Sequence, residues 1–215
     1  LTLITAIAVT ALLLLYPHGL WRISGLDRLM AIMLVIDVTA GPLLTLVIYR
    51  PGKPGLAFDL KAIGVVQAAF LGYGLHTLWL SRPVFLVGTD IRFTLVSASH
   101  IEADDLRKAA RPEWRRLPWT GPYLVGVLPP NDPKTRLALL DEFMKTGRDQ
   151  EQLPDQYRPY EEVAAVIREK AVPLDGSNGR PKGAPGQVGL PILSRDDEAW
   201  MTVDPRTGMP GYIIP

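Results

Sequence analysis

The 215-residue sequence has no cysteine, only three histidines and no long run of basic residues. Without cysteine the chain has no disulfide framework and no thiolate ligand for a metal, and its redox compartment stays open. The histidines lie in three different segments, and no serine stands in a Gly-x-Ser-x-Gly elbow. We therefore expect no enzyme, no cofactor and no metal site. A net charge of +1 also argues against nucleic acid as the main partner.

Charged residues are scarce in the first part of the chain. Of 45 charged side chains (23 basic and 22 acidic), residues 1–81 carry eight. Three apolar runs account for this difference, at residues 1–16, 29–49 and 62–80. Because a helix needs about 20 apolar residues to cross the hydrocarbon of a bilayer, these runs predict three N-terminal transmembrane helices.

The first run is short, and a cleaved signal peptide is the alternative interpretation. Such a peptide needs small residues at its cleavage site, and the segment LLLLYPHGLW offers none. Because the sequence begins at Leu1 and not at methionine, we expect the run to continue upstream as a retained helix. Lysine and arginine counts on the two sides of the runs nearly tie, so charge leaves the orientation open.

Residues 82–215 have the pattern of a small mixed α+β domain. β-Branched and aromatic residues predict strands at 83–90, 92–99 and 123–130. Near the C-terminus, the proline and glycine of DPRTG suit a hairpin turn between two apolar segments. Pro210 then makes the second strand of this hairpin an edge strand.

A first helix is predicted after the second strand. Ser99, followed three residues later by Glu102, is a capping box that opens a helix. A metal site is the alternative interpretation of this acidic segment, although acidic residues in a first helical turn are the ordinary case. The ligands of that alternative site would be His100, Glu102, Asp104 and Asp105.

Two further helices are predicted. Asp132 suits an N-cap and Pro133 a first helical position. Four apolar residues then recur at helical spacing, so we expect them to face the core: Leu137, Leu140, Phe143 and Met144. Residues 159–171 form an amphipathic pattern, and the glycine- and proline-rich residues 173–189 predict a flexible loop.

Asp37 is the one charged residue of the second apolar run. A carboxylate at this depth costs several kcal/mol unless it is paired or neutralised. If the second and third runs pack antiparallel, Asp37 lies level with Gly74, and both Tyr73 and His76 are within about 3 Å of that level. Pro42 removes a helical hydrogen bond and kinks the helix.

Three roles for Asp37 stay open. It stabilises the helix bundle, it forms a polar notch for the transmembrane helix of a partner, or it takes part in a proton or ion relay. A relay needs a chain of titratable groups, and only Asp37 and His76 qualify. Gly41, Gly72 and Gly74 permit the close backbone approach that a notch for a helix requires.

Sequence motifs carry a resemblance along the whole chain. Asp37 to Tyr49 has the pattern D-x-T-x-G-P-L-L-T-L-V-I-Y, and K-x-x-x-x-x-D-L follows it. Gln67, a Tyr-Gly pair, the segment RPVFLV, the segment LPWTGPYLVGVLPPNDP and the late DPRTG continue the pattern. With these motifs the chain resembles the type IV pilin accessory proteins of the TfpX/TfpZ type. The Asp-x-Thr-x-Gly-Pro core is the most specific of them.

This resemblance implies a multi-pass protein of the bacterial inner membrane whose C-terminal domain, residues 82–215, lies in the periplasm. It implies a chaperone-like accessory factor that binds the cognate type IV major pilin and supports its stability and assembly into pili. The contacts would involve the transmembrane helix of the pilin and its head domain, with membrane lipid as the other partner. The resemblance implies no catalytic residue.

The hypothesis assigns the binding of the pilin helix to an intramembrane polar notch. The notch is formed by seven residues: Asp37, Thr39, Gly41, Pro42, Gln67, Tyr73 and His76. Two alternatives remain beside this function. One is a membrane enzyme that modifies pilin, and the other is a structural component of the pilus assembly machine.

Overall fold

The structure is a computed structural model that divides the chain into two compact units. One unit is Gly25–Ser81, and the other combines Leu1–Ser24 with Arg82–Pro215. The structure describes residues 55–194 and 198–214 and, before these, only scattered positions: 15, 16, 20, 21, 23–26, 28, 31, 32, 35, 39, 43 and 46.

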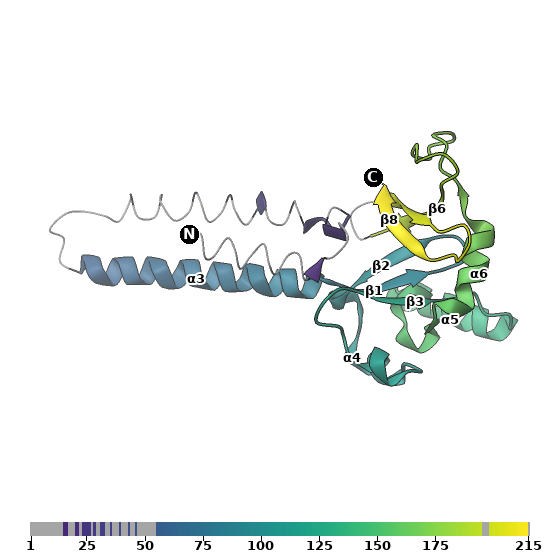
Figure 1. The fold of residues 1–215 in the computed structure, drawn as a ribbon. Helices are drawn as coiled ribbons and strands as arrows, with labels where there is room; N and C mark the ends of the chain where they lie inside the picture. Colours follow the sequence, from purple (N-terminus) through teal and green to yellow (C-terminus); the bar gives the residue numbers. More distant parts are fainter. Residues whose placement is uncertain are drawn as a thin grey trace. The chain divides into compact units, whose positions relative to one another are not determined.

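The Gly25–Ser81 unit contains the long helix α3 (Leu56–Ser81), which is shown in blue in Figure 1. Its 26 residues span about 39 Å at about 1.5 Å per residue, which exceeds the hydrocarbon thickness of a bilayer. Large apolar side chains such as Phe58 and Val65 are exposed, at 75% and 69%. By length and composition, α3 can cross a membrane.

The prediction of three N-terminal transmembrane helices is wrong. Within the part of the chain that the structure describes, α3 is the one helix that is long and apolar enough to cross a membrane. It contains the third predicted run, residues 62–80. The runs at 1–16 and 29–49 lie, apart from scattered positions, outside the described residues. A hydropathy pattern records apolar length alone, so it does not by itself establish a transmembrane helix.

In its described residues, the other unit is built on one mixed sheet of eight strands. Seven follow the order β4-β3-β1-β2-β6-β7-β8, and β5 pairs with β6. The β1–β3 and β2–β6 pairs are parallel and the others are antiparallel. The strands are β1 (Pro83–Gly88), β2 (Phe93–Ser97), β3 (Tyr123–Gly126), β4 (Arg158–Pro159), β5 (Val172–Pro173), β6 (Val188–Leu193), β7 (Glu198–Val203) and β8 (Pro210–Ile214).

Helices lie between these strands in the sequence. They are α4 (Ala103–Lys108), α5 (Pro133–Thr146) and α6 (Glu161–Lys170), with short 3-10 helices at Ala98–His100, Pro112–Arg115, Gln150–Gln152 and Pro154–Gln156. The predicted strands at 83–90, 92–99 and 123–130 and the predicted helix at 159–171 are confirmed as β1, β2, β3 and α6. The edge position of β8 is also confirmed.

The sheet of this domain nonetheless has more strands than the small α+β domain that we predicted. Strand β6 lies inside a segment (VGLPIL) whose Gly189 and Pro191 are typical of loops. It forms because β7 pairs with it along six residues, while β2 and β5 pair with parts of its other edge. Tertiary pairing therefore overrides the local preference of these two residues.

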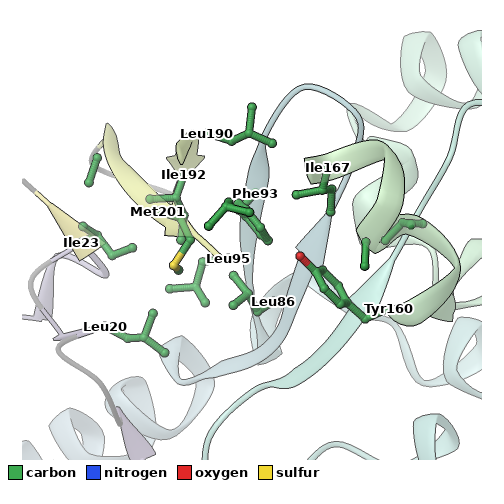
Figure 2. Packing of buried hydrophobic residues seen from close by; sticks show 14 residues of the cluster. Leu20, Ile23, Leu86, Phe93, Leu95, Tyr160, Ile167, Leu190, Ile192 and Met201 are labelled. Carbon is green, nitrogen blue, oxygen red and sulfur yellow. The ribbon is translucent and has the colours of Figure 1, made fainter. Parts of the chain in front are cut away.

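The sheet has an apolar core on each of its faces. On one face, Phe85, Val87, Val96 and Val125 pack with Trp114. On the other face, residues of β1, β2, β6, β7 and α6 converge, as Figure 2 shows, and Leu20 and Ile23 from the N-terminal segment join them. All six residues of β1 are buried. This explains why its sequence is an unbroken apolar run and not an alternating pattern.

Helix α6 packs against a part of the sheet where two adjacent strands have no side chain. Gly88 of β1 and Gly126 of β3 are direct partners in the parallel ladder. A Cβ atom on Gly88 would lie 2.7 Å from Cδ1 of Ile167, and one on Gly126 would overlap Cγ2 of Val163. Val163 and Ile167 are both fully buried. The two glycines therefore let α6 approach the backbone of the sheet.

The same helix holds the turn between β7 and β8. The hydroxyl of Tyr160 donates a hydrogen bond of 2.6 Å to the carbonyl of Gly208, and Arg168 donates one of 3.0 Å to the carbonyl of Arg206. Gly208 has a φ of 77°, and a Cβ atom there would overlap the carbonyl oxygen of Ala164. The predicted DPRTG hairpin is confirmed, and its glycine is required for close approach as well as for the turn.

Two arginines fix the segment between α5 and α6. Arg92 donates to Glu151 at 2.8 Å and to Asp149 at 3.0 Å. Glu151 is buried, and burial together with the charge of Asp149 raises its pKa. Arg148 donates to the buried carboxylate of Asp105 on α4 and, at 3.0 Å, to Glu142 on α5. These ion pairs connect the residue before β2, and helices α4 and α5, to one short stretch of chain.

The helix that we predicted to open at Ser99 begins one turn later. Ser99 belongs to the 3-10 helix Ala98–His100, and α4 starts after Glu102, whose side chain makes no capping hydrogen bond. Between them Ile101 is buried and extended, with φ −107° and ψ 123°. The capping-box prediction is wrong because packing of Ile101 interrupts the helix that the local pattern favours.

The ends of α5 agree with the prediction, but its apolar face does not. Asp132 accepts a hydrogen bond of 3.0 Å from the backbone of Thr135, Pro133 is the first residue, and Gly147 ends the helix with a φ of 71°. The four residues that we expected in the core are exposed at 65%, 56%, 45% and 76%, respectively: Leu137, Leu140, Phe143 and Met144. Helical spacing identifies a shared face, but it does not say what covers that face.

We expect Gly126→Ala to destabilise the protein by about 1–3 kcal/mol, because the new methyl group would overlap Val163. Val163→Ala should remove part of this overlap. The double variant should therefore be more stable than the sum of the two single changes predicts. Thermal unfolding of the full chain in detergent, followed by tryptophan fluorescence, measures all three variants. Strict additivity would contradict the proposed contact.

A second prediction concerns acid stability. Burial acts to raise the pKa of Asp105, but hydrogen bonds from Lys108 and Arg148 outweigh it and the pKa is lowered. A lowered pKa means that the stabilisation is present above the unfolded pKa of about 4 and is lost as pH falls through the folded pKa. Asp105→Asn should thus cost about 1–3 kcal/mol at pH 7 and much less below pH 3.

The matched control for this prediction is Asp104→Asn, the same change one residue earlier. Asp104 pairs with Arg107, and both side chains are exposed. We expect an effect within about 0.5 kcal/mol at either pH, because exposed ion pairs contribute little. Equal pH profiles for the two variants would refute the assignment of acid sensitivity to Asp105.

Candidate functional site

The structure describes four of the seven residues assigned to the polar notch. Asp37, Gly41 and Pro42 lie outside the described residues, while Thr39, Gln67, Tyr73 and His76 are described. The hydroxyl of Thr39 donates a hydrogen bond of 2.6 Å to the carbonyl of Val35, four residues earlier. This bond to its own helical turn is the usual one for threonine in an apolar helix.

The described notch residues of α3 lie on two different faces. Tyr73 is 72% exposed and His76 is exposed, whereas Gln67 is half-buried. At about 100° per residue, His76 lies about 60° from Tyr73 but about 180° from Gln67. Gln67 instead shares a shielded stripe with Ile63 and Gly74, which are both buried. Tyr73 and His76 therefore form one polar position on the exposed face, without Gln67.

The acidic segment around α4 is occupied by ion pairs within the chain. Asp105 binds Lys108 and Arg148, and Asp104 binds Arg107 at 2.9 Å. Among the described residues, no group of three or more histidine, aspartate or glutamate side chains is placed to hold a metal ion. Asp105 therefore connects α4 to Arg148, whereas Asp104 forms an ion pair within the helix.

The other unit contains an apolar pocket of about 370 Å³ that the sequence did not predict. Its lining comes from both ends of the sheet, from β1 and β3 and from β7 and β8. These strands meet around one pocket because the sheet curls. The lining residues are Leu20, Leu86, Gly121, Pro122, Leu124, Met201, Pro210, Gly211 and Ile213.

Strand β8 combines this pocket with an open sheet edge. Within the part of the chain that the structure describes, it ends the strand order and pairs with β7 alone. The backbone of Tyr212 is directed toward β7, since its N–H and its carbonyl both bond the hydroxyl of Thr202, at 2.8 and 3.0 Å. Backbone groups alternate in direction along a strand. Those of Gly211 and Ile213, two residues that line the pocket, therefore point toward the open edge.

This geometry suits the binding of an apolar group. None of the nine described lining residues carries an ionisable side chain, so the pocket offers no acid, base or nucleophile. An apolar pocket of this volume suits one or two large apolar side chains. The backbone edge beside it can pair with an added strand. Two aromatic residues near the lining in sequence, Trp119 and Tyr212, are exposed at 78% and 54%.

A signal for the pocket does exist in the sequence. Gly121-Pro122 and Pro210-Gly211 are the two Gly/Pro pairs of the lining, one beside β3 and one on β8. From the local sequence, each pair predicts a turn or the end of a strand. Only the curl of the sheet, which depends on contacts far apart in the chain, brings them to the same pocket.

Comparison with known proteins gives three related proteins from Dichelobacter nodosus. The chain is 30% identical over 161 residues to its fimbrial assembly protein of serogroup I, covering 74% of this chain and 62% of that protein. Identity to the fimbrial assembly protein of serogroup E1 is 29% over 178 residues, covering 81% of this chain and 68% of that protein. No family model and no solved structure matches.

The third relative is the fimbrial assembly protein of serogroups C1 and C2. It is 31% identical to this chain over 96 residues, which are 44% of this chain and 73% of that protein. The matched part of the serogroup I protein is less than two thirds of its length, whereas most of the C1 and C2 protein is covered. On this similarity, the chain belongs to the fimbrial assembly protein family.

Proposed function

We propose that this protein is an inner-membrane accessory factor of the TfpX/TfpZ type, which binds its cognate major pilin and supports its stability and assembly into pili. Membership of the fimbrial assembly protein family is the observation that carries the proposal. The Asp-x-Thr-x-Gly-Pro motif that begins at Asp37 supports the finer assignment. The proposal gives the chain a binding role and assigns it no reaction.

Helix α3 supports a location in the membrane. Its apolar side chains are exposed, and its length exceeds the thickness of the hydrocarbon. Polar side chains on such a surface are costly in lipid, which favours a role for Tyr73 and His76 in contacting a polar group of another helix. The family resemblance implies that pilins carry a glutamate within the membrane. We propose that this carboxylate meets Tyr73 and His76.

The unit that contains the sheet supports recognition of the pilin head on the periplasmic side. An extended segment of the head can add to the edge of β8 and place an apolar side chain in the adjacent pocket. The main-chain hydrogen bonds would provide affinity, and the pocket would select the side chain. In this proposal the membrane helix holds the pilin, and the domain distinguishes the cognate pilin from others.

Deletion of the gene should shorten the half-life of the cognate pilin severalfold and reduce the number of pili. The reason is that an unaccompanied pilin helix keeps an unsatisfied carboxylate in lipid and becomes a better substrate for membrane proteases. Pulse-chase labelling of pilin, with pilus counts by electron microscopy, measures both. An unchanged half-life together with an unchanged pilus number would end the accessory-factor proposal.

Complementation of the deletion strain provides the matched control. A Tyr73→Leu/His76→Leu variant should reach the membrane, because leucine is favourable in lipid, but should not restore the half-life of pilin. A Gln67→Leu variant should restore it, because Gln67 lies on the shielded stripe of α3. Restoration by both variants would show that the polar position on the exposed face of α3 has no role.

The pocket is tested by a pair of substitutions on β8. Ile213→Trp should fill the pocket that Ile213 lines, whereas Ile214→Trp adds the same bulk on the other side of the strand. We expect the first variant to retain at most about a tenth of the pilin that wild type copurifies and the second to retain most of it. Equal retention by the two variants would exclude the pocket from pilin binding.

A further inference from the structure

Helix α5 leaves its apolar face uncovered. No residue of the helix is buried, and four of its large apolar side chains are between 45% and 76% exposed. These side chains define the α5 face, which consists of Leu137, Leu140, Phe143 and Met144. An amphipathic helix of a globular protein ordinarily buries such a face. Contiguous exposed apolar side chains of this kind mark interaction sites.

The helix is held in place without the α5 face. At its start, the side chain of Asp132 caps the helix and Arg136 donates a hydrogen bond of 3.0 Å to the carbonyl of Pro130. At its end, Gly147 adopts the left-handed conformation, and the adjacent Arg148 binds Glu142 at 3.0 Å. Polar contacts therefore order α5 and fix its direction, while its apolar side chains stay available.

The charges of α5 indicate the chemistry of a partner. Its two acidic residues are engaged by bases of the same chain, Asp141 by Lys145 and Glu142 by Arg148. At about 100° per residue, Arg136 lies within the α5 face, between Leu140 and Phe143. Among the described residues, no acidic side chain forms an ion pair with Arg136, whose guanidinium keeps further N–H donors.

We infer that the α5 face docks a segment of the pilin head that presents apolar side chains beside a carboxylate, with the carboxylate bound by Arg136. This inference rests on the proposed function, because it takes the pilin as the partner. It adds a second contact surface, distinct in its residues from β8 and the pocket. Apolar burial supplies affinity, and the charge-assisted hydrogen bond to Arg136 fixes the register of the segment.

The test compares two substitutions that add the same charge to opposite faces of α5. The tagged full-length protein is coexpressed with the pilin and purified from membranes in mild detergent. Leu140→Glu should weaken the association with pilin by about tenfold or more. Ala138→Glu, about 160° from Leu140 around the helix, should leave it within about twofold. Since both sites are exposed, both variants should unfold at the temperature of wild type.

A photoreactive residue supplies an independent measurement. Placed at Met144, which is 76% exposed, it should crosslink to the pilin head, whereas the same residue at Ala138 should not. Arg136→Gln should reduce the Met144 crosslink severalfold, and Arg136→Lys should retain more of it because the charge is kept.

The outcomes separate this inference from the proposed function. If the wild-type protein captures no pilin, the proposed function fails and the pilin docking fails with it. If the wild-type protein captures pilin and Leu140→Glu captures as much, only the α5 docking is overturned. A Met144 crosslink to a second copy of this chain or to lipid alone would also overturn the docking while leaving the proposed function intact.

Discussion

The contact between α6 and the backbone of two adjacent strands is the constraint on which the rest of the domain depends. Gly88 and Gly126 stand opposite each other on β1 and β3, and neither position has room for a side chain beneath Val163 and Ile167. From this position on the sheet, α6 contacts the β7–β8 turn through the hydroxyl of Tyr160 at its N-terminus. The helix therefore connects β1 and β3 to the turn before β8, although β8 is the fourth strand from β1 in the sheet.

The pocket and the edge of β8 follow from that connection. The turn at Gly208 is fixed to α6 by a hydrogen bond and by close contact with Ala164, so β8 leaves the turn in a defined direction. The curl then places Ile213 of β8 and Leu86 of β1 on the lining of the same pocket. Binding surfaces on loops and edges are effective only when a rigid scaffold orients them. Here the close packing of α6 on Gly88 and Gly126 supplies that rigidity.

Much of the local structure could be predicted from the sequence. The cap of α5 by Asp132, the DPRTG turn and the strand β1 each depend on a few neighbouring residues, and each is confirmed. The predicted resemblance to a pilus family agrees with membership of the fimbrial assembly protein family, which the relative from Dichelobacter nodosus shows. Caps and turns can be predicted because the residues that cause them are close together in the sequence.

The failures have one physical origin. Ile101 is extended because of core packing, and β6 forms around Gly189 and Pro191 because of its partner strands. The α5 face is exposed because no element of the described residues covers it. In each case a distant contact, or its absence, decides the outcome. The three predicted transmembrane helices fail for a related reason, since apolar length does not specify surroundings. The sequence did not predict the pocket, because its lining residues come together only when the sheet curls.

The parallel pairing of β2 with β6 also has a consequence for how the domain folds. Strands β1 and β2 form a local hairpin, and β6, β7 and β8 form a local meander. Among the described residues, two registered pairs of the sheet join them, Phe93 with Ile192 and Thr94 with Leu193, across about a hundred residues of sequence. Closing so long a loop for so few pairings is slow. The sheet should therefore assemble as two preformed halves whose joining limits the folding rate, and the pocket exists only after that last step.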